Sequence, residues 1–116
     1  MSTQSPPFDV RARHVAAAHV VAPRGELDLY SVTGVREALA ERPDGCATVV
    51  LDFRGLSFFD TTGLRLVLET LQDLDSRGVR FALVRGGPEV QRLFALARLE
   101  DRLPFFDELD EALAAH

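Results

Sequence analysis

The amino-acid sequence predicts a single-domain α/β fold, in which a mixed β-sheet has a parallel core and an antiparallel hairpin at one edge. Residues 48–53 form an almost unbroken run of β-branched and aliphatic side chains, which is typical of a central strand covered on both faces. From Leu64 onward the apolar residues recur at helical spacing instead. Strand and helix patterns then alternate to the end of the chain, so about four helices are expected to pack on the sheet.

The segments around this central strand predict the other strands. Residues 8–15 alternate polar and apolar side chains, as an edge strand with one wet face does. Residues 17–22 should pair with them, before residues 23–28 turn the chain away. Strands are also expected over residues 79–84 and 103–105, and their alternation with helices indicates parallel pairing in the middle of the sheet.

Capping residues and helical periodicity predict where the helices begin. The first is expected to start near Ser31, the longest to cover residues 61–76, the third to open at Pro88, and the last to cover residues 108–115 after Asp107. The longest helix is amphipathic, so one face should contact the sheet. The side chains expected on that inward face are Leu64, Val67, Leu68, Leu71 and Leu74, with Arg65, Glu69, Gln72 and Asp73 on the outward face.

Charge and composition exclude several classes of function. The 116 residues carry a formal net charge of −5, whereas domains that bind a nucleic-acid backbone usually show a basic surface, so we expect no direct nucleic-acid binding. All 13 basic residues are Arg, and the absence of Lys excludes a phosphate-loop lysine and Schiff-base chemistry. We therefore expect a binding module rather than an enzyme, with no cofactor of its own.

The chain is expected to work in the cytoplasm. Residues 1–7 are polar with two prolines and predict a flexible N-terminal tail, followed by one domain over residues 8–116. Cys46 is the single cysteine, so neither an internal disulfide nor a Cys-x-x-Cys motif exists. The longest weakly polar run, residues 15–23, is far shorter than the roughly 20 residues that span a bilayer. No membrane insertion is therefore expected.

Polar residues gather where the longest helix is expected to begin. Asp60, Thr61 and Thr62 stand where the strand pattern gives way to the helical one, and Gly63 follows them. Unpaired backbone N–H groups and the positive end of the helix dipole favour an anionic group such as phosphate at this position. The same residues also fit a simple helix cap without further function.

Two motifs resemble a known family. The first covers residues 51–65, where a buried strand is expected to lead through an apolar loop, Leu-Ser-Phe-Phe, into Asp-Thr-Thr-Gly, and the second is Gly25-Glu26-Leu27-Asp28. Their order and separation resemble the STAS domain, named for sulphate transporters and anti-sigma factor antagonists. The resemblance implies a STAS fold for residues 8–116 and the function of an anti-sigma factor antagonist that regulates sigma-factor-dependent transcription.

The resemblance also implies a regulatory site. The hydroxyl residue directly after the aspartate is the expected phosphate acceptor, which is Thr61 here, with Thr62 as the alternative. The donor would be ATP held by an anti-sigma factor serine/threonine kinase, and a phosphatase would restore the free hydroxyl. Asp28, Asp60, Thr61, Thr62 and Gly63 are then the expected partner-binding residues. Asp28 equally fits a turn cap, and Gly63 either admits the partner's active site or is only sterically convenient.

Other functions fit parts of the sequence. A STAS regulatory subunit of a membrane transport or lipid-trafficking complex would use the same surface without obligatory phosphorylation. A nucleotide-binding domain is disfavoured because a glycine-rich phosphate loop with lysine is missing. His14 and His19 are expected on opposite faces of a strand, with His116 far away, so neither a metal site nor a catalytic triad is predicted.

Overall fold

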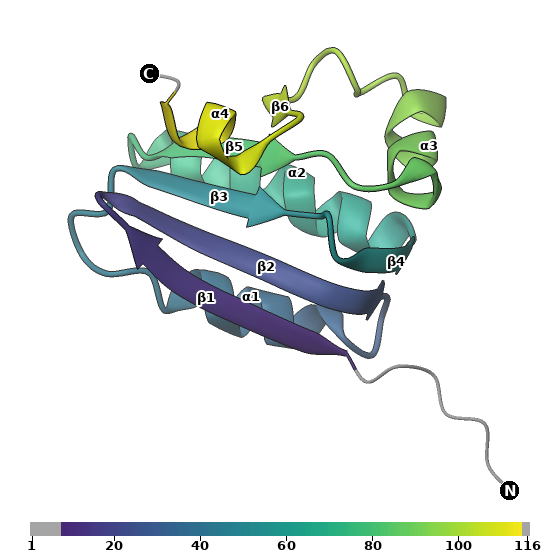
Figure 1. The fold of residues 1–116 in the computed structure, drawn as a ribbon, viewed down its shortest axis with the longest axis horizontal. Helices are drawn as coiled ribbons and strands as arrows, with labels where there is room; N and C mark the ends of the chain where they lie inside the picture. The colour runs from purple at the N-terminus through teal and green to yellow at the C-terminus, as the bar shows by residue number, and fades with distance from the viewer. Residues whose placement is uncertain (1–7, 115–116) are drawn as a thin grey trace, which may run out of the picture.

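The structure, a computed structural model, describes residues 8–114 as alternating strands and helices around one sheet (Figure 1). The strands are β1 (Asp9–Val15), β2 (Ala18–Leu27), β3 (Thr48–Asp52), β4 (Leu56–Phe59), β5 (Arg80–Val84) and β6 (Phe105–Phe106). The helices are α1 (Val32–Ala40), α2 (Thr61–Ser76), α3 (Pro88–Leu96) and α4 (Leu109–Ala114). The predicted tail over residues 1–7 and the predicted helix end at residue 115 lie outside the described residues.

The sheet is mixed, as predicted. Its strand order is β1-β2-β3-β5-β6, with β4 paired to β2 beside this path. The β1–β2 hairpin is antiparallel, whereas β2–β3, β3–β5, β5–β6 and β2–β4 are all parallel. The strand rich in β-branched residues, β3, lies at the centre, and four of its five residues are buried. The parallel core and the antiparallel edge hairpin are therefore confirmed.

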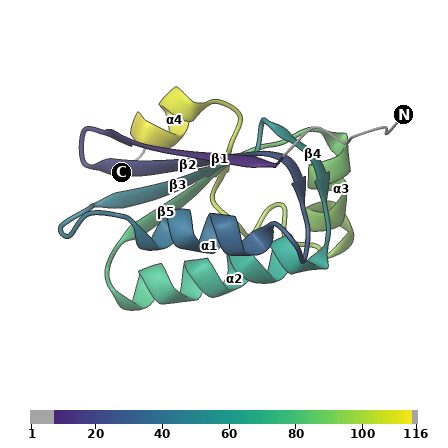
Figure 2. The same ribbon diagram turned by 90° about the horizontal axis from the view of Figure 1, so that it is seen from below.

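Helices cover the two faces of the sheet unequally. Helices α1 and α2 lie on one face, and α4 lies on the other (Figure 2). The larger core cluster fills the side of α1 and α2 and includes Leu51, Phe53 and Phe94, which are fully buried. A smaller cluster of Val20, Val50, Ala82, Val84, Leu109 and Ala112 lies under α4.

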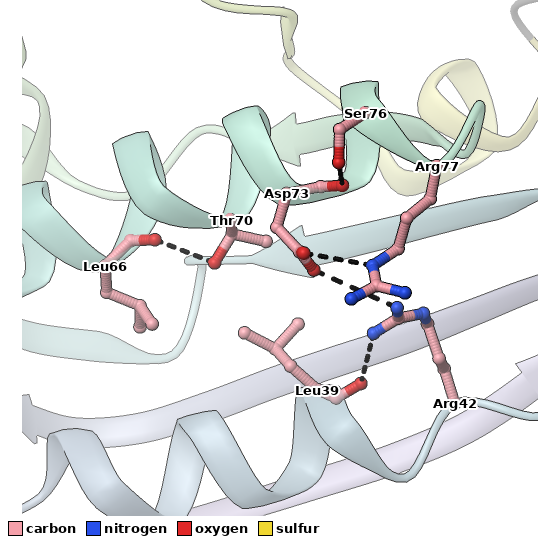
Figure 3. A network of polar contacts seen from close by, with 7 residues as sticks. All are labelled: Leu39, Arg42, Leu66, Thr70, Asp73, Ser76 and Arg77. Carbon is pink, nitrogen blue, oxygen red and sulfur yellow. Dashed lines mark hydrogen bonds and ion pairs between the residues drawn. The ribbon is translucent and has the colours of Figure 1, made fainter.

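Ion pairs join α1 to α2 along their exposed sides. Arg36 Nη2 lies 2.9 Å from Glu69 Oε1. Just after α1, Arg42 Nη2 lies 3.9 Å from Asp73 Oδ2 (Figure 3). Asp73 also accepts from Arg77 Nε, at the C-terminal cap of its own helix, at 3.0 Å. Exposed pairs of this kind contribute at most about 1 kcal/mol each. They align the two helices, whereas the apolar core beneath them supplies most of the stability.

Strand β2 is longer than predicted, and β4 was expected to be a loop. Residues 23–28 predicted a turn, yet β2 continues through Pro23 to Leu27. Gly25 adopts φ of 99°, and the pairing register with β4 shifts between Gly25 and Glu26. Leu56 pairs with Gly25 and Phe58 with Glu26, so the extra residue at this irregularity is Ser57 of β4. Gly25 faces this bulge with a backbone conformation that residues with a side chain rarely adopt.

Smaller differences concern the C-terminal elements. The short strand predicted over residues 103–105 is β6 at Phe105–Phe106, and α4 begins at Leu109 instead of residue 108. The Glu108 N–H instead donates to Glu111 Oε1 at 3.0 Å, so Glu108 precedes the helix as part of its cap. Shifts of one or two residues at element ends are expected when only periodicity is available.

The inward face of α2 differs from the predicted one. Val67 and Leu74 are buried as expected, but Leu68 is 39% exposed and Leu66 is 1% exposed. Leu66 was not expected in the core. The face is rotated because α2 packs against α1 and the sheet together, and Leu66 points toward the α1 side, where it lines a groove with Leu39 and Leu74.

A close contact explains the glycine in the first turn of α2. Gly63 is buried, and a Cβ on it would run into the Phe59 ring. That ring is itself held between Phe53 and Phe94, with centroids 5.3 and 5.1 Å away. The ring therefore has little freedom to yield, and the close approach of α2 to β4 requires a residue without a side chain.

Replacing Leu66 by alanine should lower the free energy of unfolding by about 2–5 kcal/mol, because the change empties a packed aliphatic site. The matched change Leu68→Ala, on the same helix but largely solvated, should cost less than about 1 kcal/mol. Urea unfolding of both variants measures the difference. Equal losses would contradict the orientation of α2.

Gly63→Ala should destabilise the protein by about 1–3 kcal/mol, because the new methyl group overpacks the Phe59 ring. Gly34 provides the control, since it is the third residue of α1 as Gly63 is of α2. A Cβ at Gly34 would lie 3.5 Å from Phe8 Cε2, an ordinary contact. Gly34→Ala should therefore stabilise by about 0.4–1 kcal/mol. Thermal unfolding shifts of the same sign for both variants would contradict this packing.

Candidate functional site

The pairing of β2 with β4 brings two polar loops together at one end of the sheet. Leu27 and Phe59 are register partners in this parallel pair. The next residues along the two strands are Asp28 and Asp60, so both aspartates leave adjacent strands in the same direction. Figure 1 shows the ends of β2 and β4 next to the starts of α1 and α2. Carboxyl ends of parallel strands are the usual place for a site in α/β sheets.

Asp60 caps α2 and leaves Thr61 at the surface. Its Oδ1 accepts a hydrogen bond from the Thr62 N–H at 2.9 Å, and its carbonyl oxygen accepts from the Leu64 N–H at 3.2 Å. Thr61 is the first residue of the helix and is exposed, whereas Thr62 is half-buried. The capping interpretation of Asp60 is thus correct, and this cap fixes the backbone that carries the Thr61 hydroxyl.

Asp28 organises the loop between β2 and α1. Its Oδ1 accepts from the backbone N–H groups of Tyr30 at 2.9 Å and Ser31 at 3.1 Å. Ser31 Oγ in turn donates to the Glu26 carbonyl oxygen at 2.6 Å and accepts from the Asp28 N–H at 3.0 Å. Asp28 therefore has the turn-capping role that was one of its two predicted interpretations. Leu29 and Tyr30, the two residues between Asp28 and Ser31 in this turn, are exposed.

Large apolar side chains stand exposed around these two aspartates. Leu29 is 70% exposed and Tyr30 is 93% exposed in the loop after β2, and Phe58 on β4 is 44% exposed. Sequence reasoning missed all three, although Leu29 and Tyr30 directly follow the Gly-Glu-Leu-Asp motif. We call the set of Asp28, Leu29, Tyr30, Phe58, Asp60 and Thr61 the strand-exit surface. Exposed apolar groups gathered beside polar ones are typical of protein interaction sites.

Two further polar residues position β4. The Arg54 guanidinium makes a two-pronged ion pair with Asp52, with Nε 2.9 Å from Oδ1 and Nη2 2.7 Å from Oδ2. The Arg54 N–H also donates to Asp52 Oδ1 at 3.1 Å, which closes the turn between β3 and β4. The hydrogen bond with the almost buried Asp52 raises the pKa of Arg54 above its ordinary value. Sequence reasoning missed this pair, and the i, i+2 spacing of opposite charges after a strand was the available signal.

His14 and His19 lie on the same face of the hairpin, which corrects the prediction of opposite faces. They are cross-strand partners, and their ring centroids are 5.1 Å apart. The error arose because the chain reverses between them. His19 is buried, and its Nε2 donates to the Ala38 carbonyl oxygen at 2.8 Å. Within residues 8–114, no three His, Cys, Asp or Glu side chains gather closely enough to hold a metal ion.

A groove lies between α1 and α2, apart from the strand-exit surface. Its volume is about 260 Å³, and its apolar floor includes Leu39, Leu66 and Leu74. The charged residues on its rim pair with one another across the two helices. Within the described part of the chain, no helix has the length and apolar character that a membrane span needs.

Comparisons with known proteins agree with this architecture. The sequence model of the STAS domain matches residues 9–112. An anti-sigma-B factor antagonist from Staphylococcus aureus is 32% identical over 78 residues, which cover 66% of this chain and 72% of the relative. The crystal structure of an anti-sigma factor antagonist from Mycobacterium paratuberculosis has a TM-score of 0.84 and 26% identity, over 95% of this chain and 96% of that chain.

A further solved structure shows the same fold in a modified state. SpoIIAA, a cell fate determinant of Bacillus, has been solved in its phosphorylated form, with a TM-score of 0.69 and 24% identity over 92% of this chain and 96% of that chain. The named relatives are regulators rather than enzymes, as was predicted for this chain. Together with the fold and the two motifs, the match of the STAS sequence model to residues 9–112 shows that the chain belongs to the STAS domain family.

Proposed function

We propose that this chain is an anti-sigma factor antagonist that binds an anti-sigma factor kinase through the strand-exit surface. Phosphorylation at Thr61 by that kinase switches the antagonist off. The observation that carries the proposal is the exposed Thr61 hydroxyl at the start of α2, beside exposed apolar residues on the adjacent strand end. The names of the relatives supply the class of partner.

The position of Thr61 suits a phosphate acceptor better than that of Thr62. Thr61 is exposed, whereas Thr62 is half-buried and its N–H is engaged by Asp60. A kinase must bring its bound ATP in line with the hydroxyl that attacks, which requires open space on the acceptor side. Only Thr61 has this access without a change in the first turn of α2.

The exposed side chains around Thr61 supply binding free energy before phosphorylation. Tyr30 and Leu29 project from a turn that Asp28 already orders, so binding costs little conformational entropy in the loop. Aromatic side chains are enriched among the residues that dominate interface energies. Gly63, which was predicted as a contact residue, supports this surface from within by letting α2 approach Phe59.

A phosphate on Thr61 would oppose the same contact. It adds roughly −1.5 to −2 charges and a firmly held hydration shell. Asp60 directly precedes it, and Asp28 leaves the neighbouring strand, so the new charge meets like charges. If phosphorylation removes about 3 kcal/mol of binding free energy, affinity falls more than about a hundredfold. That change is sufficient for a switch.

The remaining components belong to the partners. The kinase would hold the ATP, so this chain needs no cofactor, and a phosphatase would return Thr61 to its free form. A pathway that uses cellular ATP and controls sigma-factor-dependent transcription places the chain in the cytoplasm. The single cysteine agrees with that compartment, because no internal disulfide is required.

Thr61→Ala should keep binding to the kinase while abolishing phosphate incorporation, because only the acceptor hydroxyl is removed. Thr61→Glu should weaken binding by placing a charge in the contact, although one carboxylate imitates phosphate incompletely. The assay is incubation with the kinase and ATP, followed by peptide mass spectrometry and calorimetric titration. Thr62→Ala is the control and should be phosphorylated normally.

Two outcomes would contradict this assignment in different ways. Phosphate on Thr62, with Thr61 unmodified, would refute the choice of acceptor and retain the switch. Tight binding to a subunit of a membrane transport or lipid-trafficking complex, with no phosphorylation by any anti-sigma kinase, would instead favour the other known role of STAS domains.

Leu29→Ala and Tyr30→Ala should each weaken kinase binding about tenfold or more, because both remove a large exposed apolar side chain from the strand-exit surface. Leu96→Ala is a matched control, since Leu96 on α3 is 69% exposed and Leu29 is 70% exposed. Titration calorimetry compares the three variants. Equal affinity of all three with the parent protein would show that the kinase docks elsewhere.

A further inference from the structure

Half of one sheet face lacks a covering layer. Helix α4 covers β3, β5 and β6 on the side opposite α1 and α2 and reaches Val20 of β2, but no helix covers β1 and the later part of β2 on this side (Figures 1 and 2). The uncovered shelf is two strands wide, or about 10 Å. An α-helix with its side chains is also about 10 Å across. The shelf therefore has the width of one missing helix.

Three arginines line this shelf. Cross-strand partners share a face, and Arg13 is paired with Val20, whose side chain belongs to the cluster under α4. Arg11 precedes Arg13 by two residues on the same strand, and Arg24 is paired with Asp9, two residues before Arg11. All three side chains therefore point to the α4 side of the sheet. We call Arg11, Arg13 and Arg24 the arginine ribbon.

The ribbon is exposed and largely unneutralised. Arg11 Nε lies 3.6 Å from Asp9 Oδ2, and 73% of the Arg11 side chain is exposed. Among residues 8–114, no ion pair involves Arg13 or Arg24, and both are exposed. Such a concentration of positive charge is unexpected on a chain with a net charge of −5. It indicates a complementary acidic surface as its partner.

Helix α4 on the same face of the same chain is acidic. Glu108, Asp110 and Glu111 are exposed at its start, while Leu109 and Ala112 face the sheet. Asp110 has no ion pair within 4 Å among the described residues, and none of the three acids pairs with the ribbon. One face thus carries a basic shelf and an acidic helix side by side.

We propose that a second copy of this chain covers the shelf, with α4 of each copy lying on the arginine ribbon of the other. A two-fold axis makes this contact reciprocal, so one arrangement satisfies both charged surfaces at once. The two α4 helices would form a shared layer between the two sheets. Ala22 and Val15 on the shelf and Leu113 on the helix, all half-buried, would supply the apolar part of the contact.

The dimer is expected to be weak and sensitive to salt. Its contact is small compared with standard specific interfaces, which bury about 800 Å² on each partner. Its charged groups are exposed, so screening reduces their attraction as the Debye length falls from about 30 Å at 0.01 M salt to about 8 Å at 0.15 M. Sedimentation velocity should therefore show a dimer fraction that grows with protein concentration and falls with added salt.

Charge reversal on the two surfaces provides the decisive test. One double variant, Arg11→Glu with Arg13→Glu, reverses the shelf, and another, Asp110→Arg with Glu111→Arg, reverses the helix. Each alone should raise the dimer dissociation constant about tenfold or more, because like charges then meet at both contacts. An equimolar mixture of the two variants should recover dimerisation, since the ribbon and helix of each then face opposite charges in the other.

The controls separate a lost contact from a lost fold. Arg92→Glu on α3 and Asp75→Arg on α2 reverse exposed charges elsewhere and should leave the dimer unchanged. Circular dichroism checks each variant, and recovery in the mixture itself requires both variants to be folded. A monomeric parent protein from about 10 μM to about 1 mM, a range that includes weak complexes, would overturn the proposal. Unchanged dimerisation of both double variants would overturn it as well.

Discussion

The pairing of β2 with two strands in succession is the constraint on which the rest of the structure depends. Ala18–Val21 of β2 pair with β3, and Gly25–Leu27 pair with β4, with a register shift between Gly25 and Glu26. Because both pairs are parallel, β2 and β4 end at the same edge of the sheet. The turn after β2 and the start of α2 become neighbours for this reason. Without β4 beside β2, Tyr30 and Thr61 would not share a surface.

Local polar contacts then turn this edge into an ordered surface. Asp52 holds Arg54 in the turn before β4, Asp28 binds the backbone of its own loop, and Asp60 caps α2. Each carboxylate is thus used to fix backbone close to it in the sequence. The residues left facing solvent are the hydroxyl of Thr61 and the apolar side chains of Leu29 and Tyr30. A partner meets groups that are already ordered, which lowers the entropic cost of binding.

Much of this structure is predictable from the sequence, and the failures have a common physical cause. The central strand, the amphipathic α2 and the Asp60 cap depend on residues close together in the chain, and all were predicted. The strand β4 and the last three residues of β2, Gly25–Leu27, pair with each other, and no local sequence pattern records this pairing. The rotation of α2 toward Leu66 and the need for Gly63 likewise depend on packing against α1 and Phe59. The exposure of Tyr30 also depends on the tertiary structure, so the local sequence does not reveal it.

The two proposed surfaces lie on different parts of the same sheet, and this separation has a consequence for regulation. Thr61 begins α2, on the face that α1 and α2 cover, whereas the arginine ribbon points to the face of α4. The two surfaces share no residue. Coupling between two sites requires that each ligand distinguishes two states of the protein. The strand β2 carries Arg24 and leads into Asp28, but pairing with β1, β3 and β4 along its length holds it in place. Each copy in a dimer would therefore present its own strand-exit surface and respond to phosphorylation independently of the other.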